Sequence, residues 1–225
     1  MAENAKLPFP DMAEPLYSTG ILPSQEIRKL IHNHEIEATQ EITKEQVQPA
    51  SIDLRLGSAA YRVRASFLPG AQSKVSDKID ALGMHEVDLG PGAVLEKGCV
   101  YIVPLMESLK LRKRTSAIAN PKSSTGRLDV FTRLITDHAV SFDLVKEAYK
   151  GPLYAEISPR AFSIVVREGM RLNQLRLRRG NPAASDKAMR RLHEEVRLVD
   201  VEPGQENISK GVAITVDLRG GDSGM

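Results

Sequence analysis

The sequence predicts a mainly β protein, an antiparallel barrel or sandwich with short peripheral helices. Two observations support this class: many short apolar runs alternate with a period near two, and glycine or proline turn signals separate them at regular intervals. This texture favours antiparallel pairing over a doubly wound parallel sheet. At 225 residues the chain is long enough to bury one full core.

The strands are expected from residue 47 onward, where the alternation begins. The expected strand segments are 51–56, 60–64, 94–95, 99–104, 116–119, 128–135, 153–158, 163–166 and 172–177. Gly70, Gly98, Gly151 and Gly169 are among the residues that punctuate them.

The beginning of the chain is expected to contribute little to the core. Residues 1–19 are polar and contain three prolines, which predicts a flexible arm. Order should begin near Gly20. A first short helix then follows, with Ser24 as its N-cap and Ile27 and Leu30 on its apolar side.

Residues 20–180 are expected to form the main domain, and residues 181–225 a helical linker. The linker helix should begin after Ser185 as its N-cap, and its apolar side comprises Met189, Leu192 and Val196. Beyond it, residues 213–219 echo residues 50–55 around a shared Asp-Leu-Arg. The echo leaves two alternatives, chance similarity or the start of a second, truncated repeat.

Composition excludes several classes of protein. Lys and Arg number 31 against 29 acids, so the charge favours a compact anionic ligand over nucleic acid. The single cysteine, Cys99, lies beside an apolar run and is expected to be structural, without a disulfide. No segment has the features of a signal peptide or a membrane span. We therefore expect a soluble cytoplasmic protein that does not bind membranes.

The segment Asn120–Arg127 has the composition of a phosphate-binding turn. Lys122 and Arg127 supply positive charge, and Gly126 allows backbone amides to approach an anion. The hydroxyls come from Ser123, Ser124 and Thr125. The spacing differs from that of a P-loop. The alternative is a solvated turn between strands.

Glu156 interrupts an otherwise apolar expected strand. Period-two alternation places Tyr154, Glu156 and Ser158 on one face, opposite the apolar side that includes Ala155. On a solvated face Glu156 would be an ordinary surface acid. On a face that lines a pocket it would be suited to proton transfer.

Zinc-dependent deamination lacks its sequence pattern. That chemistry needs His-x-Glu followed by Pro-Cys-x-x-Cys, and the cysteine pair is absent. His32 and His34 are two residues apart and would not share a helix face. We assign no metal site to histidine. Serine-hydrolase and dinucleotide motifs are absent as well.

In order, several segments resemble the dCTP deaminase branch of the dUTPase superfamily. The segments that carry the resemblance are Gly20–Ser24, Gln46–Gly57, Gly92–Gly98, Lys122–Arg127, Phe142-Asp143, Gly151, Tyr154-Ala155-Glu156 and Gly169–Leu175. The chain is most similar to the front unit of the long, duplicated form of this family. The resemblance implies a dUTPase-like fold and a homotrimer whose active sites are shared between subunits.

The resemblance also implies an activity, the hydrolysis of dCTP to dUTP and ammonia, which supplies dUTP for dTMP synthesis. Mg²⁺ would accompany the triphosphate, and no zinc would take part. Glu156 would be the general base and acid, while Ser123 and Arg127 would hold the attacking water and stabilise the tetrahedral centre. The implied substrate-binding residues are Lys122 at a phosphate, Asp143 near the deoxyribose, Gln174 at the nucleotide, and Ser124, Thr125, Gly126, Tyr154 and Ala155.

Two departures from the family pattern concern the region before Glu156. Small insertions flank Phe142, and Asp137 falls near the base, where the family has a small residue. A second carboxylate there would disturb proton transfer by Glu156. Two alternatives to a dCTP deaminase therefore remain: a dUTPase or bifunctional dCTP deaminase/dUTP diphosphatase, and a non-catalytic nucleotide-binding or assembly domain of a longer tandem enzyme.

Overall fold

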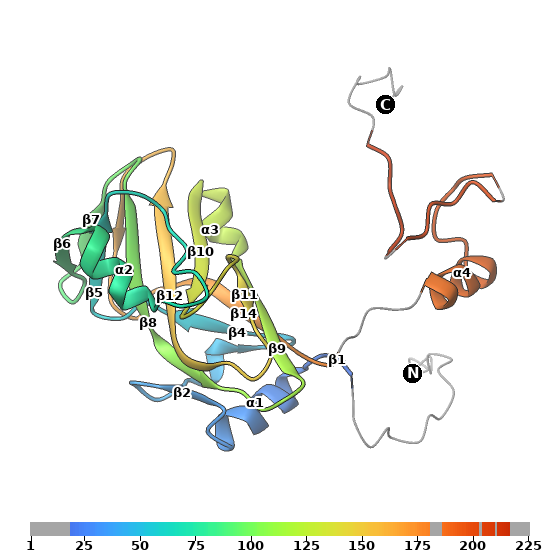
Figure 1. The fold of residues 1–225 in the computed structure, drawn as a ribbon, viewed down its shortest axis with the longest axis horizontal. Helices are drawn as coiled ribbons and strands as arrows, with labels where there is room; N and C mark the ends of the chain where they lie inside the picture. The colour runs from blue at the N-terminus through green and yellow to red at the C-terminus, as the bar shows by residue number, and fades with distance from the viewer. Residues whose placement is uncertain (1–18, 181–185, 203, 210, 217–225) are drawn as a thin grey trace, which may run out of the picture. The chain divides into compact units, whose positions relative to one another are not determined.

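The computed structural model describes residues 19–180, 186–202, 204–209 and 211–216 (Figure 1). The chain divides into two compact units, Met1–Gly180 and Asn181–Met225, and each is described by itself. The expected arm lies outside the described residues except for Thr19, and so does the expected cap Ser185. No helix among the described residues is long and apolar enough to cross a membrane.

The first unit is built from two large antiparallel sheets. One has the order β11 (Leu144–Val145), β9 (Thr115–Pro121), β14 (Arg171–Arg179), β4 (Ser51–Arg55) and β3 (Val47–Gln48), with β1 (Gly20–Ile21) beside β14. The other has the order β10 (Val130–Thr136), β12 (Lys150–Pro159), β8 (Val100–Lys110), β5 (Ala59–Val63) and β6 (Gly83–Asp88), with β2 (Ile36–Ala38) beside β8. A small third sheet pairs β13 (Ile164–Val166) with β7 (Ala93–Leu95). These pairings confirm the predicted mainly β, antiparallel class.

The central strands of the second large sheet, β8 and β12, are buried on both faces along most of their length. Ala155 of β12 and Val103 of β8 belong to the main core, which also contains side chains of the first sheet. Their neighbours Tyr154 and Ile102 point the other way and join a second apolar cluster. Because side chains alternate along a strand, β12 can place apolar groups in one cluster and its polar groups beside the other. The second cluster also contains Val75, the first residue of α2 (Val75–Leu82).

The first helix, α1 (Ser24–His32), is where the sequence predicts it, and it buries Ile27 and Leu30. The prediction that Ser24 caps it was wrong. Pro23 is the N-cap residue, and no side chain caps the helix. The Ser24 amide, one of the first-turn donors without a partner inside the helix, donates to the Pro49 carbonyl at 2.8 Å.

Several elements carry little local signal and were not predicted. They are β1, β2, β3, η1 (Lys44–Gln46), α2, β6, β11 and α3 (Ser123–Arg127), the last of which was expected to be a turn. The strand β6 pairs only with β5 and leaves much of its length exposed, so it lacks clear apolar alternation. The first turn of α2 receives the carboxylate of Asp137, which is 62 positions away.

The second unit contains α4 (Asp186–Glu195), which buries none of its residues. Of the apolar side predicted for it, Leu192 is exposed and Val196 lies beyond the end of the helix. Residues 213–216, the described part of the segment that echoes residues 50–55, form no strand. Ile214 and Val216 are exposed there, whereas the matching segment near residue 51 is β4, buried between β3 and β14.

Candidate active site

Glu156 is buried in the interior of the second large sheet. Only 1% of its surface is exposed, although it lies in the middle of β12. Its Oε2 atom has no hydrogen-bond partner among the described residues. An ionised carboxylate in such a place requires a compensating charge.

Arg133 provides that charge from the neighbouring strand β10. The antiparallel register places Arg133 directly opposite Glu156. Its Nε and Nη2 atoms donate to Oε1 of Glu156 at 3.1 and 2.5 Å. One carboxylate oxygen is therefore bound twice, while the other is left for a different partner.

Asp143 is the second carboxyl group of this cluster. Its Oδ1 atom accepts the Leu134 amide at 2.7 Å, and its backbone has a positive φ of 61°. Burial raises the pKa of Asp143, and the nearby Glu156 charge raises it further, whereas the bond from the Leu134 amide and the Arg133 charge lower it. Asp143 is thus close enough to Glu156 and Arg133 for the three charges to influence one another.

Within the Lys122 to Arg127 segment, Lys122 is the N-cap residue of the short helix α3, which follows β9 and lies beside β10 (Figure 1). Ser123, Ser124 and Arg127 are exposed and make no side-chain hydrogen bond or ion pair within the described chain. Their donors are therefore available to a ligand. Thr125 differs, because its buried hydroxyl donates to the Leu172 carbonyl at 3.0 Å and stabilises the loop.

Lys122 lines a hollow of about 370 Å³ on the first large sheet. The other lining residues are Gln48, Pro49, Ala50, Ser51, Asp53, Ser123, Gln174 and Arg176. Lys122 forms a short ion pair with buried Asp53, and the Ser51 hydroxyl donates to Oε1 of Gln174 at 3.1 Å. The hollow thus brings Gln174 together with Lys122 and Ser123, two adjacent residues from which it is distant in the sequence.

The predicted residues of β12 fall on different faces. Tyr154 shares the face of Glu156, and burial raises its pKa to about 12, so the hydroxyl stays protonated at neutral pH. Ala155 points into the main core and is fully buried. Its side chain packs between the sheets, so the substrate contact predicted for Ala155, which stays a prediction, would involve its backbone.

Asp137 was expected to disturb proton transfer by Glu156, but its carboxylate has another partner. Its Oδ1 atom accepts the Val75 amide at 2.8 Å, at the N-terminus of α2. A carboxylate at the N-terminus of a helix interacts favourably with the helix dipole and so stabilises the helix. Burial has the largest effect in raising the pKa of Asp143, and the charge of Glu156 raises it further.

Sequence reasoning missed Arg133 and Asp53, although both bind predicted site residues. Neither has a local signature, because each meets its partner only through strand pairing or sheet packing. Asn173 was missed as well. It is buried beside Gln174, and both atoms of its amide lack a partner among the described residues.

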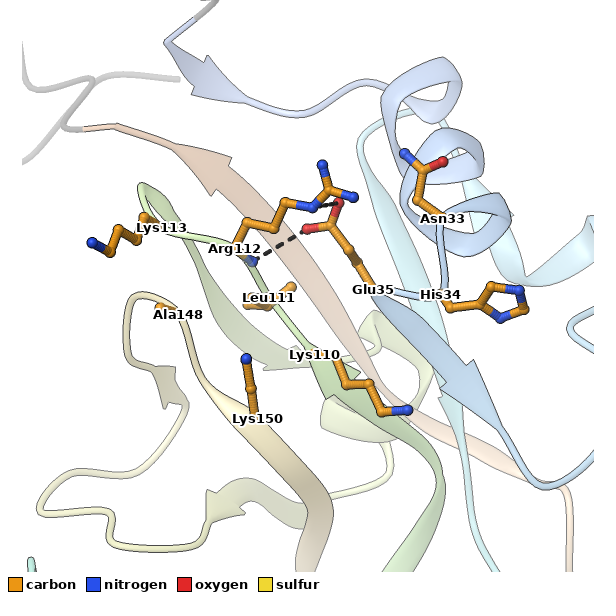
Figure 2. A pocket seen from close by; sticks show the side chains of 9 residues that line it. All are labelled: Asn33, His34, Glu35, Lys110, Leu111, Arg112, Lys113, Ala148 and Lys150. Carbon is orange, nitrogen blue, oxygen red and sulfur yellow. Dashed lines mark hydrogen bonds and ion pairs between the residues drawn. The ribbon is translucent and has the colours of Figure 1, made fainter.

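A larger hollow of about 750 Å³ lies elsewhere and contains none of the predicted site residues. Figure 2 shows the side chains that line it, among them Lys110, Arg112 and Glu35. Arg112 is bound to Glu35, with Nε at 3.3 Å and the backbone amide at 3.2 Å from its carboxylate oxygens, and Lys110 pairs with Glu37 at 2.7 Å. Two of its cations are thus already neutralised, and we place the candidate site at the smaller hollow and at Glu156.

Comparison with known proteins identifies relatives along most of the chain. A crystal structure of 2'-deoxycytidine 5'-triphosphate deaminase from Agrobacterium tumefaciens is 56% identical, with a TM-score of 0.75, and the match covers 84% of this chain and 56% of that one. A dCTP deaminase of Halorubrum lacusprofundi is 29% identical over 133 residues, 58% of this chain and 63% of the relative. A dUMP-forming dCTP deaminase of Nanoarchaeum equitans is 27% identical over 184 residues, 74% of this chain and 87% of the relative.

The chain spans less than two thirds of the length of the first two of these relatives. Its first unit nevertheless matches one family domain almost completely. Residues 18–181 match the 2'-deoxycytidine 5'-triphosphate deaminase (DCD) N-terminal domain. Because this match covers more than half of the chain, it shows that the chain belongs to the dCTP deaminase N-terminal domain family.

Proposed function

We propose that this protein hydrolyses dCTP to dUTP and ammonia without zinc, as a hydrolase of a cyclic amidine C–N bond. The family match and the names of the relatives support the reaction. The observation that carries the mechanism is the buried Glu156 carboxylate, with one oxygen bound by Arg133 and the other without a partner in the described chain. A product of this reaction would serve dTMP synthesis in the cytoplasm.

The proposed reaction uses Glu156 first as a base and then as an acid. Glu156 removes a proton from water while the water oxygen bonds to C4 of cytosine, and this proton passes to N3. The second proton of the water then moves through Glu156 to the amino group. The C4–N4 bond breaks, the carbonyl of uracil forms and ammonia leaves, so one water is consumed for each ammonia released.

Ser123 and Arg127 are proposed to hold the water and stabilise the charge that develops at the tetrahedral centre. Fixed donors in a site without bulk water lower such a barrier by several kcal/mol, on the order of 3 kcal/mol for a single donor. Both side chains are exposed, and no described hydrogen bond or ion pair links them to Glu156 of the same chain. We propose that the protein forms a homotrimer in which α3 of one copy completes the site of another, so that these exposed donors reach Glu156 of a neighbouring subunit.

The hollow beside Lys122 is the proposed nucleotide-binding surface. Lys122 would contact a phosphate, with Ser124 and the backbone at Gly126 as further donors. Gln174 would contact the nucleotide, and Asp143 would lie near the deoxyribose. A phosphate that binds Lys122 would replace Asp53 as its partner, so the buried Asp53 would need another cation. Arg171 can serve, because its Nη1 atom lies 3.9 Å from Oδ2 of Asp53, the oxygen that Lys122 binds.

Magnesium is proposed to arrive with the triphosphate. No group of three or more histidine, cysteine, aspartate or glutamate side chains is arranged to hold a metal ion among the described residues. Mg²⁺ commonly keeps several waters and binds through phosphate oxygens and one or two carboxylates. Asp53 is the one carboxylate among the residues that line the hollow, and it could take this limited role.

The decisive experiment incubates the purified chain with dCTP and Mg²⁺ and follows ammonia, dUTP, dUMP and pyrophosphate. We expect equal amounts of ammonia and dUTP. Ammonia with dUMP and pyrophosphate would instead favour the bifunctional alternative, which the name of the Nanoarchaeum equitans relative raises. Tight dCTP binding without ammonia would favour a non-catalytic domain of a longer enzyme, an alternative raised by the partial coverage of the longer relatives.

A further inference from the structure

Arg133 is more firmly held than an ordinary arginine near the surface. Its Nη2 atom donates to the Ser66 hydroxyl at 2.7 Å in addition to Glu156. Its guanidinium lies 3.5 Å from the ring centroid of Phe142 and 4.8 Å from that of Phe131. Stacking and hydrogen bonds together restrict the planar group to one orientation.

The bonds from Arg133 are also unequal between the two carboxylate oxygens. Both of its donors reach Oε1, whereas an arginine that only neutralises a carboxylate commonly binds both oxygens side by side. Oε2 remains buried and has no partner among the described residues. The geometry therefore distinguishes one oxygen that is anchored from one that is open to a reacting molecule.

Among the described residues, Arg133 is the only cation with a contact to the carboxyls of Glu156 and Asp143. Glu156 is contacted by Arg133 from β10, faces apolar Ile102 of β8 and has Tyr154 on its own strand. Asp143 contributes a second carboxyl from the segment before β11. Removing the arginine would leave two neighbouring carboxyls without a counter-charge, and protonation would relieve their repulsion.

We propose that Arg133 is a positioning residue that anchors Oε1 of Glu156, keeps the carboxylate ionised and leaves Oε2 to take the proton of the attacking water. This inference rests on the proposed function for its kinetic consequence. Its structural part, the control of the ionisation of Glu156, is independent of turnover. Two kinds of measurement can therefore test it separately.

The kinetic test compares Arg133→Gln and Arg133→Lys with the control Arg160→Gln. Arg160 also lies over the ring of Phe131, with its Cζ atom 5.5 Å from the ring centroid, but it has no described bond to Glu156. We expect Arg133→Gln to lower kcat about 10- to 100-fold, the loss that corresponds to charge-assisted hydrogen bonds, with a change in KM for dCTP below about threefold. The acid limb of its pH profile should move to higher pH.

Arg133→Lys should separate charge from geometry. The lysine keeps the cation but loses the planar fork and most of the stacking. We expect its acid limb to stay near that of the wild type, while kcat falls to a value between those of the wild type and Arg133→Gln. A residue that served only stability would lower the urea midpoint and the active fraction without moving the limb.

The second test follows the side-chain carboxyl of Glu156 by ¹³C NMR, with the resonance assigned from Glu156→Gln. In Arg133→Gln this resonance should titrate at higher pH than in the wild type and in Arg160→Gln. If the titration moves but the wild type releases no ammonia, the proposed function fails and the role of Arg133 in ionisation stands. If ammonia is released and Arg133→Gln matches Arg160→Gln in its titration or its kcat, the inference is overturned.

Discussion

The substitution Glu156→Gln removes the proposed acid and base while preserving the shape of the side chain. The amide oxygen can still accept from Arg133, so the strand pairing of β10 and β12 should persist. The lost charge leaves Arg133 without a full counter-ion. Because the Arg133 side chain is 24% exposed, water can compensate in part, and we expect a stability loss of about 1–3 kcal/mol.

The expected effect on turnover is much larger than the effect on folding. A positioned general acid or base contributes about 10²- to 10⁴-fold, which corresponds to about 3–5 kcal/mol of barrier. Glu156 is proposed to act on both proton transfers, so kcat should fall toward the upper end of that range. The affinity for dCTP should stay near that of the wild type, because the phosphate contacts lie on α3 and the first sheet.

Ammonia release measures kcat, and calorimetric titration measures the affinity for dCTP. Glu86→Gln is a suitable control, because Glu86 is an exposed glutamate in the strand β6. Urea midpoints of both variants would show the folded fraction. Unchanged turnover in Glu156→Gln would refute the proposed mechanism, and an equal loss in Glu86→Gln would show that the effect is not specific to the site.

Three further predictions concern the phosphate contact, the second carboxyl and the metal. Lys122→Ala should weaken dCTP binding at least about tenfold and deoxycytidine binding far less, by calorimetry, since a charged hydrogen bond is lost; the exposed Lys97→Ala is the control, and equal losses for both ligands would contradict a phosphate role. Burial raises the pKa of Asp143 above its ordinary value of 3.8, so the folded state binds this proton more tightly than the unfolded state does. The wild type therefore loses stability as the pH rises from 3.8 through the raised pKa of the folded state. Asp143→Asn tolerates the positive φ and keeps the Leu134 bond, so its urea midpoint relative to the wild type should rise from pH 4 to pH 7.5, and a relative fall would contradict the assignment. Treatment with 1,10-phenanthroline followed by Mg²⁺ should leave ammonia release intact, whereas an activity that only zinc restores would overturn the zinc-free mechanism.

The strands with strong alternation were predictable because successive residues of a strand point to opposite faces, so the residue types along the strand distinguish the two faces. In β12 the alternation of Ala155 with Tyr154 and Glu156 correctly separated the main core from the opposite face. The sequence left open whether that opposite face is solvated. In the structure this face is buried, because side chains of α2 and of other segments form an apolar cluster over it, which no local sequence pattern predicts.

Elements without a local signature were missed for a related reason. The edge strand β6 exposes both faces along part of its length, and the start of α2 is stabilised by Asp137 from a distant segment. At the start of α1, where Pro23 and not Ser24 is the N-cap residue, the Ser24 amide donates to the distant Pro49 carbonyl. In each case a tertiary contact provides what a local rule would have sought in neighbouring residues.

By itself, the sequence determined the antiparallel β class, most of the strands, and the two segments that contain Glu156 and the Lys122 loop, because residue types and their spacing are written along the chain. Only the tertiary structure decided that Glu156 is buried, that Arg133 binds one of its oxygens and that Lys122 meets Asp53. Arg133 and Glu156 are 23 positions apart and become partners through strand register alone. Burial and register depend on which strands pack together, and this is a property of the whole fold.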